Sequence, residues 1–92
     1  MLFATADRLI AVEVKGASAP STDVVRGLFQ CVKYEAVLDA ETRVTGGAFD
    51  CEAVLALGGP LPASLTGLKH SLGVRVFENL ALVSSVRRVH YR

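Results

Sequence analysis

The polar side chains best placed for chemistry belong to two segments of the chain. Residues 9–15 alternate, so that Glu13 and Lys15 share one face of a predicted strand. Gln30 and Tyr34 lie four residues apart on a predicted helix and therefore share one helical face. A glutamate and a lysine on one strand most often form a solvated pair of little energetic value. The polar pair on the helix makes a site more plausible, because its side chains can reach the end of the strand.

Together these residues resemble the signature of a known nuclease family. The Glu13-Val14-Lys15 strand, a loop and a helix carrying Gln30 and Tyr34 are similar to the PD-(D/E)XK nuclease superfamily. The similarity is strongest to the branch related to the RecB nuclease domain, whose helix bears a Gln-x-x-x-Tyr signature. It covers roughly residues 2–57. The resemblance implies a restriction-endonuclease-like core that hydrolyses phosphodiester bonds of DNA with Mg²⁺ or Mn²⁺.

The resemblance implies a role for each matching residue. Glu13 corresponds to the second acidic ligand of a hard divalent cation, with the backbone carbonyl of Val14 as a further ligand. Lys15 corresponds to the residue that orients or deprotonates the attacking water and stabilises charge on the scissile phosphate. Gln30 and Tyr34 correspond to residues that position the substrate, Lys15 or a metal-bound water.

The chain departs from the family pattern in its first residues. The family carries an earlier Asp and an N-terminal helix, and neither has a counterpart here, since Asp7 falls in a predicted turn. One carboxylate holds a hydrated Mg²⁺ poorly, so we expect weak or absent metal binding if that Asp is missing. Two other interpretations therefore stand beside an active nuclease. One is a non-catalytic, self-associating α/β module that keeps the fold, and the other is a chain incomplete at its start.

Length and composition describe one small domain. The chain has 92 residues, of which 51% are hydrophobic and 21% are charged, with a net charge of +1. These values exclude a disordered chain and a polybasic protein that binds nucleic acid through clustered positive charge. We expect one domain over residues 1–92, with a core at 1–79 and a basic tail at 80–92. So small a core has marginal stability, which favours a homodimer or a second subunit.

The sequence contains no pattern typical of export or of membrane insertion. The apolar first residues meet Asp7 and Arg8 without a preceding basic segment, unlike a signal peptide. Apolar runs are shorter than the roughly 20 residues of a membrane helix. Cys31 and Cys51 are too few for a disulfide scaffold, so we expect reduced thiols in a cytoplasmic protein with no membrane partner.

The first half of the chain predicts a hairpin followed by a helix. The first sixteen residues read as two strands around a turn, and residues 16–21 as a loop. The helix has Ser21 or Thr22 as its N-cap and ends near Glu41. Its predicted buried stripe repeats at three- and four-residue spacing: Val25, Leu28, Phe29, Val32 and Ala36.

The second half predicts two more strands with a helix between them. Residues 51–57 form an apolar strand, a helix begins at Pro62 and is capped by Gly73, and residues 74–77 form the last strand. Residues 84–92 predict either a tail or an element that docks elsewhere. The order ββαβαβ predicts an α/β fold with a mixed sheet and flanking helices.

Overall fold

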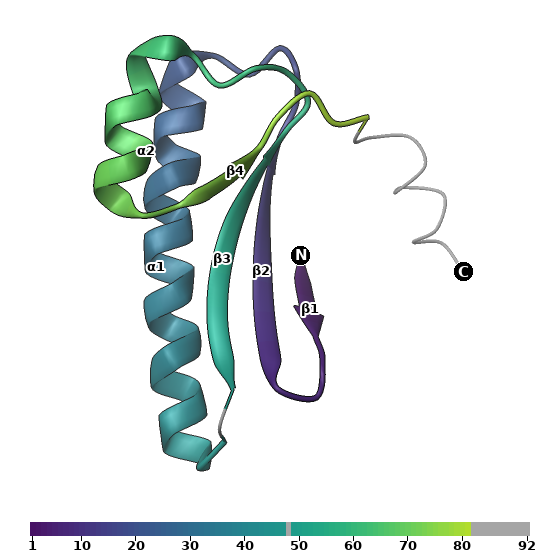
Figure 1. The fold of residues 1–92 in the computed structure, drawn as a ribbon, viewed down its shortest axis with the longest axis vertical. Coiled ribbons are helices and arrows are strands. Elements are labelled where there is room, and N and C mark those ends of the chain that lie inside the picture. Colours follow the sequence, from purple (N-terminus) through teal and green to yellow (C-terminus); the bar gives the residue numbers. More distant parts are fainter. Residues whose placement is uncertain (48, 82–92) are drawn as a thin grey trace.

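The chain begins with an antiparallel β-hairpin (Figure 1). The computed structural model describes residues 1–47 and 49–81. In it, β1 (Leu2–Ala4) pairs with β2 (Arg8–Lys15), and Leu2 lies opposite Ala11. At the turn, the Thr5 amide donates to the Arg8 carbonyl oxygen over 2.9 Å. The polar turn between two runs of apolar residues explains why the chain reverses here, as the sequence predicts.

Two further strands extend the hairpin into a four-stranded mixed sheet of order β1-β2-β3-β4. β3 (Asp50–Leu57) runs parallel to β2 and places Leu55 opposite Glu13. β4 (Arg75–Phe77) runs parallel to β3 and forms the other edge. Parallel neighbours need a crossover between them, and helices supply both crossovers. The fold is therefore α/β.

The crossover from β2 to β3 is the long helix α1 (Ser21–Thr45). The predicted side-chain cap is wrong: Pro20 occupies the N-cap and no side chain bonds to the first turn. Proline suits this place because its fixed φ is compatible with a helix start and it has no amide to satisfy. The helix also continues past the predicted end near Glu41, and Gly46 ends it with a φ of 75°.

The buried face of α1 differs from the predicted stripe. Phe29 and Val32, predicted to be buried, are 50% and 40% exposed, and Ala36 is exposed as well. The helix instead buries a stripe with smaller members: Val24, Gly27, Leu28, Cys31 and Thr42. The prediction failed because it followed the largest apolar side chains. The sheet packs against a face on which Gly27 and Cys31 let the helix approach closely.

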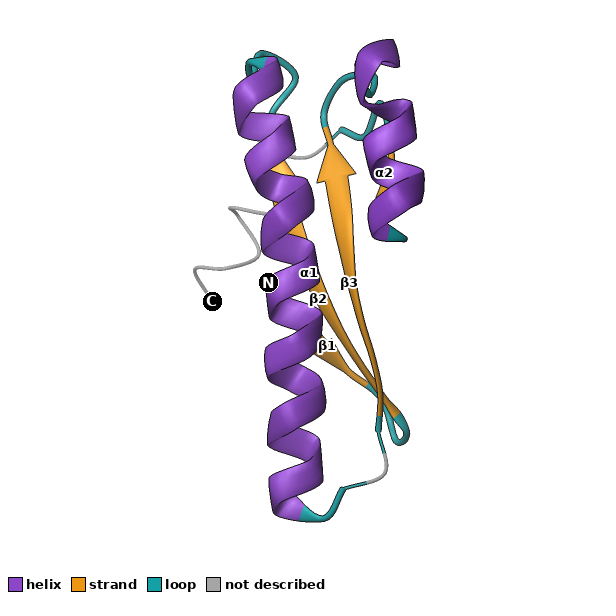
Figure 2. Ribbon diagram, turned by 90° about the vertical axis from the view of Figure 1, so that its left-hand side faces the viewer, coloured by secondary structure: helices purple, strands orange, loops and turns teal. Residues whose placement is uncertain are grey.

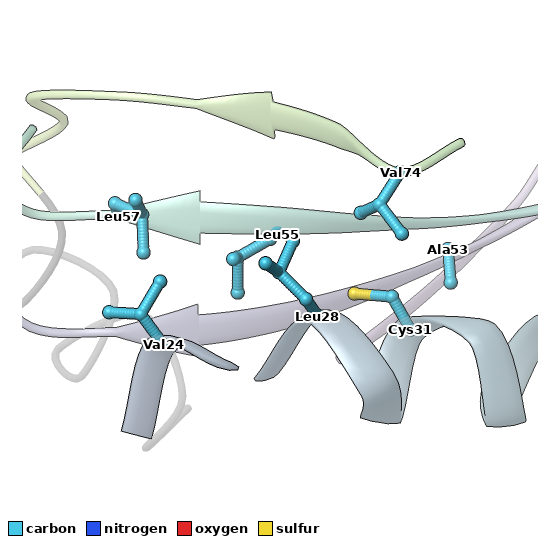
Figure 3. Close-up of a cluster of buried hydrophobic side chains, with 7 residues drawn as sticks. All are labelled: Val24, Leu28, Cys31, Ala53, Leu55, Leu57 and Val74. Atoms are coloured by element: carbon cyan, nitrogen blue, oxygen red, sulfur yellow. The ribbon is translucent and has the colours of Figure 1, made fainter. Parts of the chain in front are cut away.

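The core joins α1 to β3 (Figure 3). Leu28 and Leu55 are fully buried, and Cys31 is 1% exposed. Together with these, four further side chains make up the cluster: Val24, Ala53, Leu57 and Val74. Every second residue of β3 faces α1, so the apolar run of this strand supplies most of the sheet's share.

The second crossover is short. A 3-10 turn (Ala63–Leu65) leads into α2 (Thr66–Leu72), which Gly73 ends with a φ of 69°. The predicted helix start at Pro62 thus holds only as a 3-10 turn, with Pro62 at its N-cap position. Leu68 and Leu72 of α2 pack against the same core as α1. Both helices therefore cover one face of the sheet, as Figure 2 shows.

The other face of the sheet carries no helix among residues 1–47 and 49–81. Because side chains alternate along β2, Ile10, Val12 and Val14 point to that face while Glu13 and Lys15 point toward α1. Val14 is 41% exposed there, and on β4 Phe77 is 42% exposed.

The predicted basic tail lies mostly outside the described residues. Arg87, Arg88, His90 and Arg92 all belong to residues 82–92, which the structure does not describe. Of the described helices, none combines the length and the apolar character needed to cross a membrane. Cys31 and Cys51 are both free thiols.

Candidate functional site

Lys15 lies against α1 and not in bulk solvent. A Cβ atom added to Gly27 would stand 3.3 Å from Cε and 3.6 Å from Cγ of Lys15. The aliphatic part of the lysine side chain therefore crosses the helix at Gly27, which has no side chain to block it. The lysine side chain is only 21% exposed. Its ammonium group is thus held at the junction of strand and helix, where it can meet an anion.

Glu13 shares this junction. Its carboxylate Oε2 lies 3.5 Å from Nζ of Lys15, and its side chain is 18% exposed. The Glu13 charge, followed by desolvation, raises the pKa of the Tyr34 hydroxyl. The same charge adds to the effect of burial in raising the pKa of the Cys31 thiol to about 11. Glu13 therefore faces the part of α1 that carries Cys31 and Tyr34, and both groups stay protonated near neutral pH.

Gln30 lies on α1 between the contacts of Lys15 and Glu13. It follows Gly27 by three residues and precedes Tyr34 by four, so the three share one face of the helix. Its side-chain oxygen Oε1 is buried and has no hydrogen-bond partner among the described residues. A buried acceptor without a donor costs about 1–3 kcal/mol, which makes Gln30 the polar group with most to gain from a donor on a bound water or ligand.

The backbone carbonyl of Val14 is directed to the open side of β2. The Val12 amide donates to the Met1 carbonyl oxygen over 2.7 Å, whereas the Gly58 amide donates to the Lys15 carbonyl oxygen over 2.9 Å. Successive residues of a strand point their carbonyls to opposite sides. That of Val14 therefore points to the same side as Val12, beyond the last β1 pair at Leu2.

A resident metal ion does not fit this set of donors. Glu13 supplies one carboxylate and Val14 one carbonyl oxygen. Within residues 1–47 and 49–81 no three His, Cys, Asp or Glu side chains gather closely enough to hold a metal. Asp7, the earlier acidic residue, lies in the turn at the opposite end of β2, where its carbonyl accepts from the Asp50 amide. Mg²⁺ sites usually rest on two or more acidic side chains, and of the residues predicted for the site only Glu13 is acidic.

Two residues that shape the site have no chemical signature. Gly27 makes room for Lys15. It also lets the helix approach β3 closely, because a Cβ atom added to it would lie only 3.0 Å from Cδ1 of Leu55. Cys31 lies in the core beside Glu13. Only their position in the sequence could have indicated that Gly27 and Cys31 belong to the site, because both lie within one helical turn of Gln30 and near Tyr34 on the helix surface.

The geometry therefore groups Glu13, Lys15 and Tyr34 at one helix–sheet junction, with Gln30 on the helix face between them. Comparison with known protein families, curated proteins and solved structures finds no match to this chain.

Proposed function

We propose that this chain is a nuclease-like domain that holds a phosphodiester of DNA at the junction of β2 and α1. The observation that carries the proposal is the placement of Lys15 across Gly27, with Glu13 acting on Tyr34. Two residues of a strand and two of a helix, distant in sequence, thereby face one small volume. Their order along the chain is also the order in which PD-(D/E)XK nucleases carry their signature, and the resemblance supplies the activity: hydrolysis of the phosphodiester bond.

Each side chain has a chemical part in this proposal. The Lys15 ammonium donates to a non-bridging phosphate oxygen and offsets its charge. Glu13 restrains that ammonium through the 3.5 Å ion pair. Tyr34, which stays protonated, donates a hydrogen bond, and the orphaned oxygen of Gln30 accepts one from a water beside the phosphate.

Hydrolysis with Mg²⁺ or Mn²⁺ requires at least one acidic ligand in addition to Glu13. Substrate phosphates complete many magnesium sites, but such sites still rest on the carboxylates that the protein provides. We therefore propose that the chain binds DNA by itself and cleaves it only where a second acidic group stands beside Glu13.

A nuclease assay tests the proposal directly. Single- and double-stranded DNA are incubated with Mn²⁺ and with the natural chain or Lys15→Ala, and binding of the same DNA is measured in EDTA. Binding that Lys15→Ala weakens supports the DNA site, and cleavage absent from Lys15→Ala supports hydrolysis. Equal binding by the two proteins would overturn the site.

Calorimetric titration with Mn²⁺ separates the metal from the DNA. A heat of binding present in the natural chain and lost in Glu13→Ala would show that Glu13 holds the ion. Equal, negligible heats in both proteins would remove the metal from the proposal and leave DNA binding to be judged by the Lys15→Ala comparison.

The sheet face on which no described helix packs favours a second candidate function, a non-catalytic module that associates with a second copy of itself. Phe3 and Phe77 are 52% and 42% exposed on this face. Beside them Glu52 pairs with Arg8 at 2.8 Å and with Arg75 at 3.3 Å, so the face carries both signs of charge. Two copies related by a twofold axis can bring opposite charges together around the apolar side chains.

Molar mass in solution tests this second function. We expect the natural chain to have twice its monomer mass and Phe77→Glu to be monomeric. The matched control is Val44→Glu, which places the same charge at a site that is 87% exposed on α1. A monomeric natural chain would exclude self-association.

A cytoplasmic location stays a prediction from the sequence.

A further inference from the structure

A cavity of about 250 Å³ opens directly beside the candidate site. One wall comes from the hairpin and the other from the middle of α1. Most of its lining is apolar, and Glu13 and Tyr34 bring polar side chains to it; the other lining residues are Met1, Leu2, Ala11, Val12, Val37 and Leu38. The cavity exists because α1 packs on β2 and β3, leaving the inner side of edge strand β1 uncovered.

The walls of this cavity are apolar and also accessible to solvent. Leu2 is 56% exposed and Val37 is 47% exposed, although both lie on the side of the sheet that the described helices cover. Burying such side chains against a flat apolar ligand releases water from both. The Tyr34 ring adds an aromatic surface, and the Glu13 carboxylate adds an acceptor for an N–H group.

A nucleobase has the chemistry that this cavity would recognise. It is flat and largely apolar on its faces, and it carries N–H donors on its edge. In a duplex those edges are paired and the faces are stacked, so only an unpaired base can lay its face against these side chains. A base placed here leaves its own phosphate close to Lys15, because Glu13 lines the cavity and lies 3.5 Å from the lysine ammonium.

We propose that the cavity between Leu2, Val37 and Tyr34 binds one unpaired nucleobase, next to the phosphate that the site holds. This inference rests on the proposed function, because the site beside the cavity must hold the adjoining phosphate. The net charge of +1 is too small for a long electrostatic track along a strand. The domain therefore recognises about one nucleotide and not an extended segment.

Fluorescence of a DNA strand carrying 2-aminopurine tests the cavity without metal or hydrolysis. In EDTA, we expect a saturable fluorescence change with a terminal, unpaired 2-aminopurine. A blunt duplex with the same base paired should bind at least about tenfold more weakly. The logarithm of affinity should fall with the logarithm of salt with a slope of only about −0.7, as expected for one phosphate of a single strand.

A matched pair of variants locates the binding. Val37→Glu puts a carboxylate into the cavity and should weaken binding of the unpaired base by at least about tenfold. Val44→Glu adds the same charge to the same helix outside this cavity and should change binding less than about twofold. Circular dichroism of both variants checks that the exposed substitutions leave the fold intact.

The outcomes distinguish this inference from the proposed function. Equal affinity for duplex and single strand, or equal losses in the two variants, overturns the nucleobase cavity, whatever the nuclease assay shows. Cleavage that depends on Lys15 but not on Val37 leaves the proposed function standing alone. Absence of cleavage, together with base binding lost in Val37→Glu, overturns hydrolysis and supports the cavity.

Discussion

Lys15 of β2 occupies the space beside Gly27 of α1, with Cε of the lysine 3.3 Å from the position that a Cβ atom on residue 27 would take. The same Cβ position lies 3.0 Å from Cδ1 of Leu55. A side chain at residue 27 must therefore displace either the lysine stem or a core leucine. This contact fixes where the lysine ammonium stands, and the candidate site depends on it.

Gly27→Ala should separate stability from binding. Alanine favours a helix interior by up to about 1 kcal/mol over glycine, and crowding against Lys15 and Leu55 offsets that gain. We expect the free energy of unfolding to change by less than about 1 kcal/mol, while affinity for DNA falls several-fold because the lysine shifts. Urea unfolding and anisotropy of labelled DNA measure the two effects.

The control for this substitution is Gly67→Ala in α2, where no atom lies within 4 Å of an added Cβ. It should leave DNA binding unchanged and raise the free energy of unfolding by up to about 1 kcal/mol. If Gly27→Ala behaves like Gly67→Ala in both measurements, Lys15 is not held by this contact.

Glu13→Gln should lower the pKa of Tyr34. The Glu13 carboxylate is the largest cause of the raised pKa of that hydroxyl, and glutamine removes the charge while keeping the shape. The ultraviolet absorbance of the phenolate follows the titration. The chain has two tyrosines, so the curve of Tyr34→Phe is subtracted to isolate Tyr34. An unchanged Tyr34 titration in Glu13→Gln would show that the two side chains do not interact.

Gly58→Ala should destabilise the end of β2 that carries Lys15. A Cβ at Gly58 would stand 2.7 Å from the backbone nitrogen of Ala17, and backbone cannot move aside as a side-chain end can. We expect a loss of about 1–3 kcal/mol in the free energy of unfolding by urea. Gly16→Ala is the matched substitution, because nothing lies within 4 Å of its Cβ position. Similar stabilities for the two variants would contradict the close approach.

Local patterns were enough to predict several elements. Alternation over residues 9–15, the apolar run at 51–57 and the cap at Gly73 correspond to β2, β3 and the end of α2. These features depend on neighbouring residues only. The sharing of one strand face by Glu13 and Lys15, and of one helix face by Gln30 and Tyr34, follows from period alone.

The face on which each element packs could not be predicted in the same way. In β2 the side that carries Ile10, Val12 and Val14 is the more apolar one, and it points away from both helices. The side with Glu13 and Lys15 points toward α1. The core is filled instead by β3, whose Leu55 is fully buried. Likewise α1 buries Gly27 and Cys31 while Phe29 is 50% exposed. In both cases the close packing of α1 against the strands determines which side is buried. The hydrophobicity of a single segment does not indicate how closely it packs against another.

Stability should fall in alkaline solution because of Cys31. Burial, with smaller contributions from the charges of Glu13 and Glu35, raises the pKa of this thiol from 9.0 to about 11. Between those values the unfolded chain has lost a proton that the folded chain still holds, so raising the pH favours unfolding. The stability conferred by the neutral thiol is thus fully present below pH 9 and lost as pH rises toward 11. The raised pKa of Tyr34 acts in the same direction.

Urea unfolding of the natural chain and of Cys31→Ala measures this effect. In the natural chain we expect the free energy of unfolding to fall by up to about 1.4 kcal/mol per pH unit for this one proton. Cys31→Ala lowers stability at every pH, because it removes a side chain that is only 1% exposed. Its decline with pH should nevertheless be shallower, since only the remaining groups titrate. Equal slopes in the two proteins would show that the Cys31 thiol titrates alike in the folded and unfolded chain, and so is not buried beside Glu13.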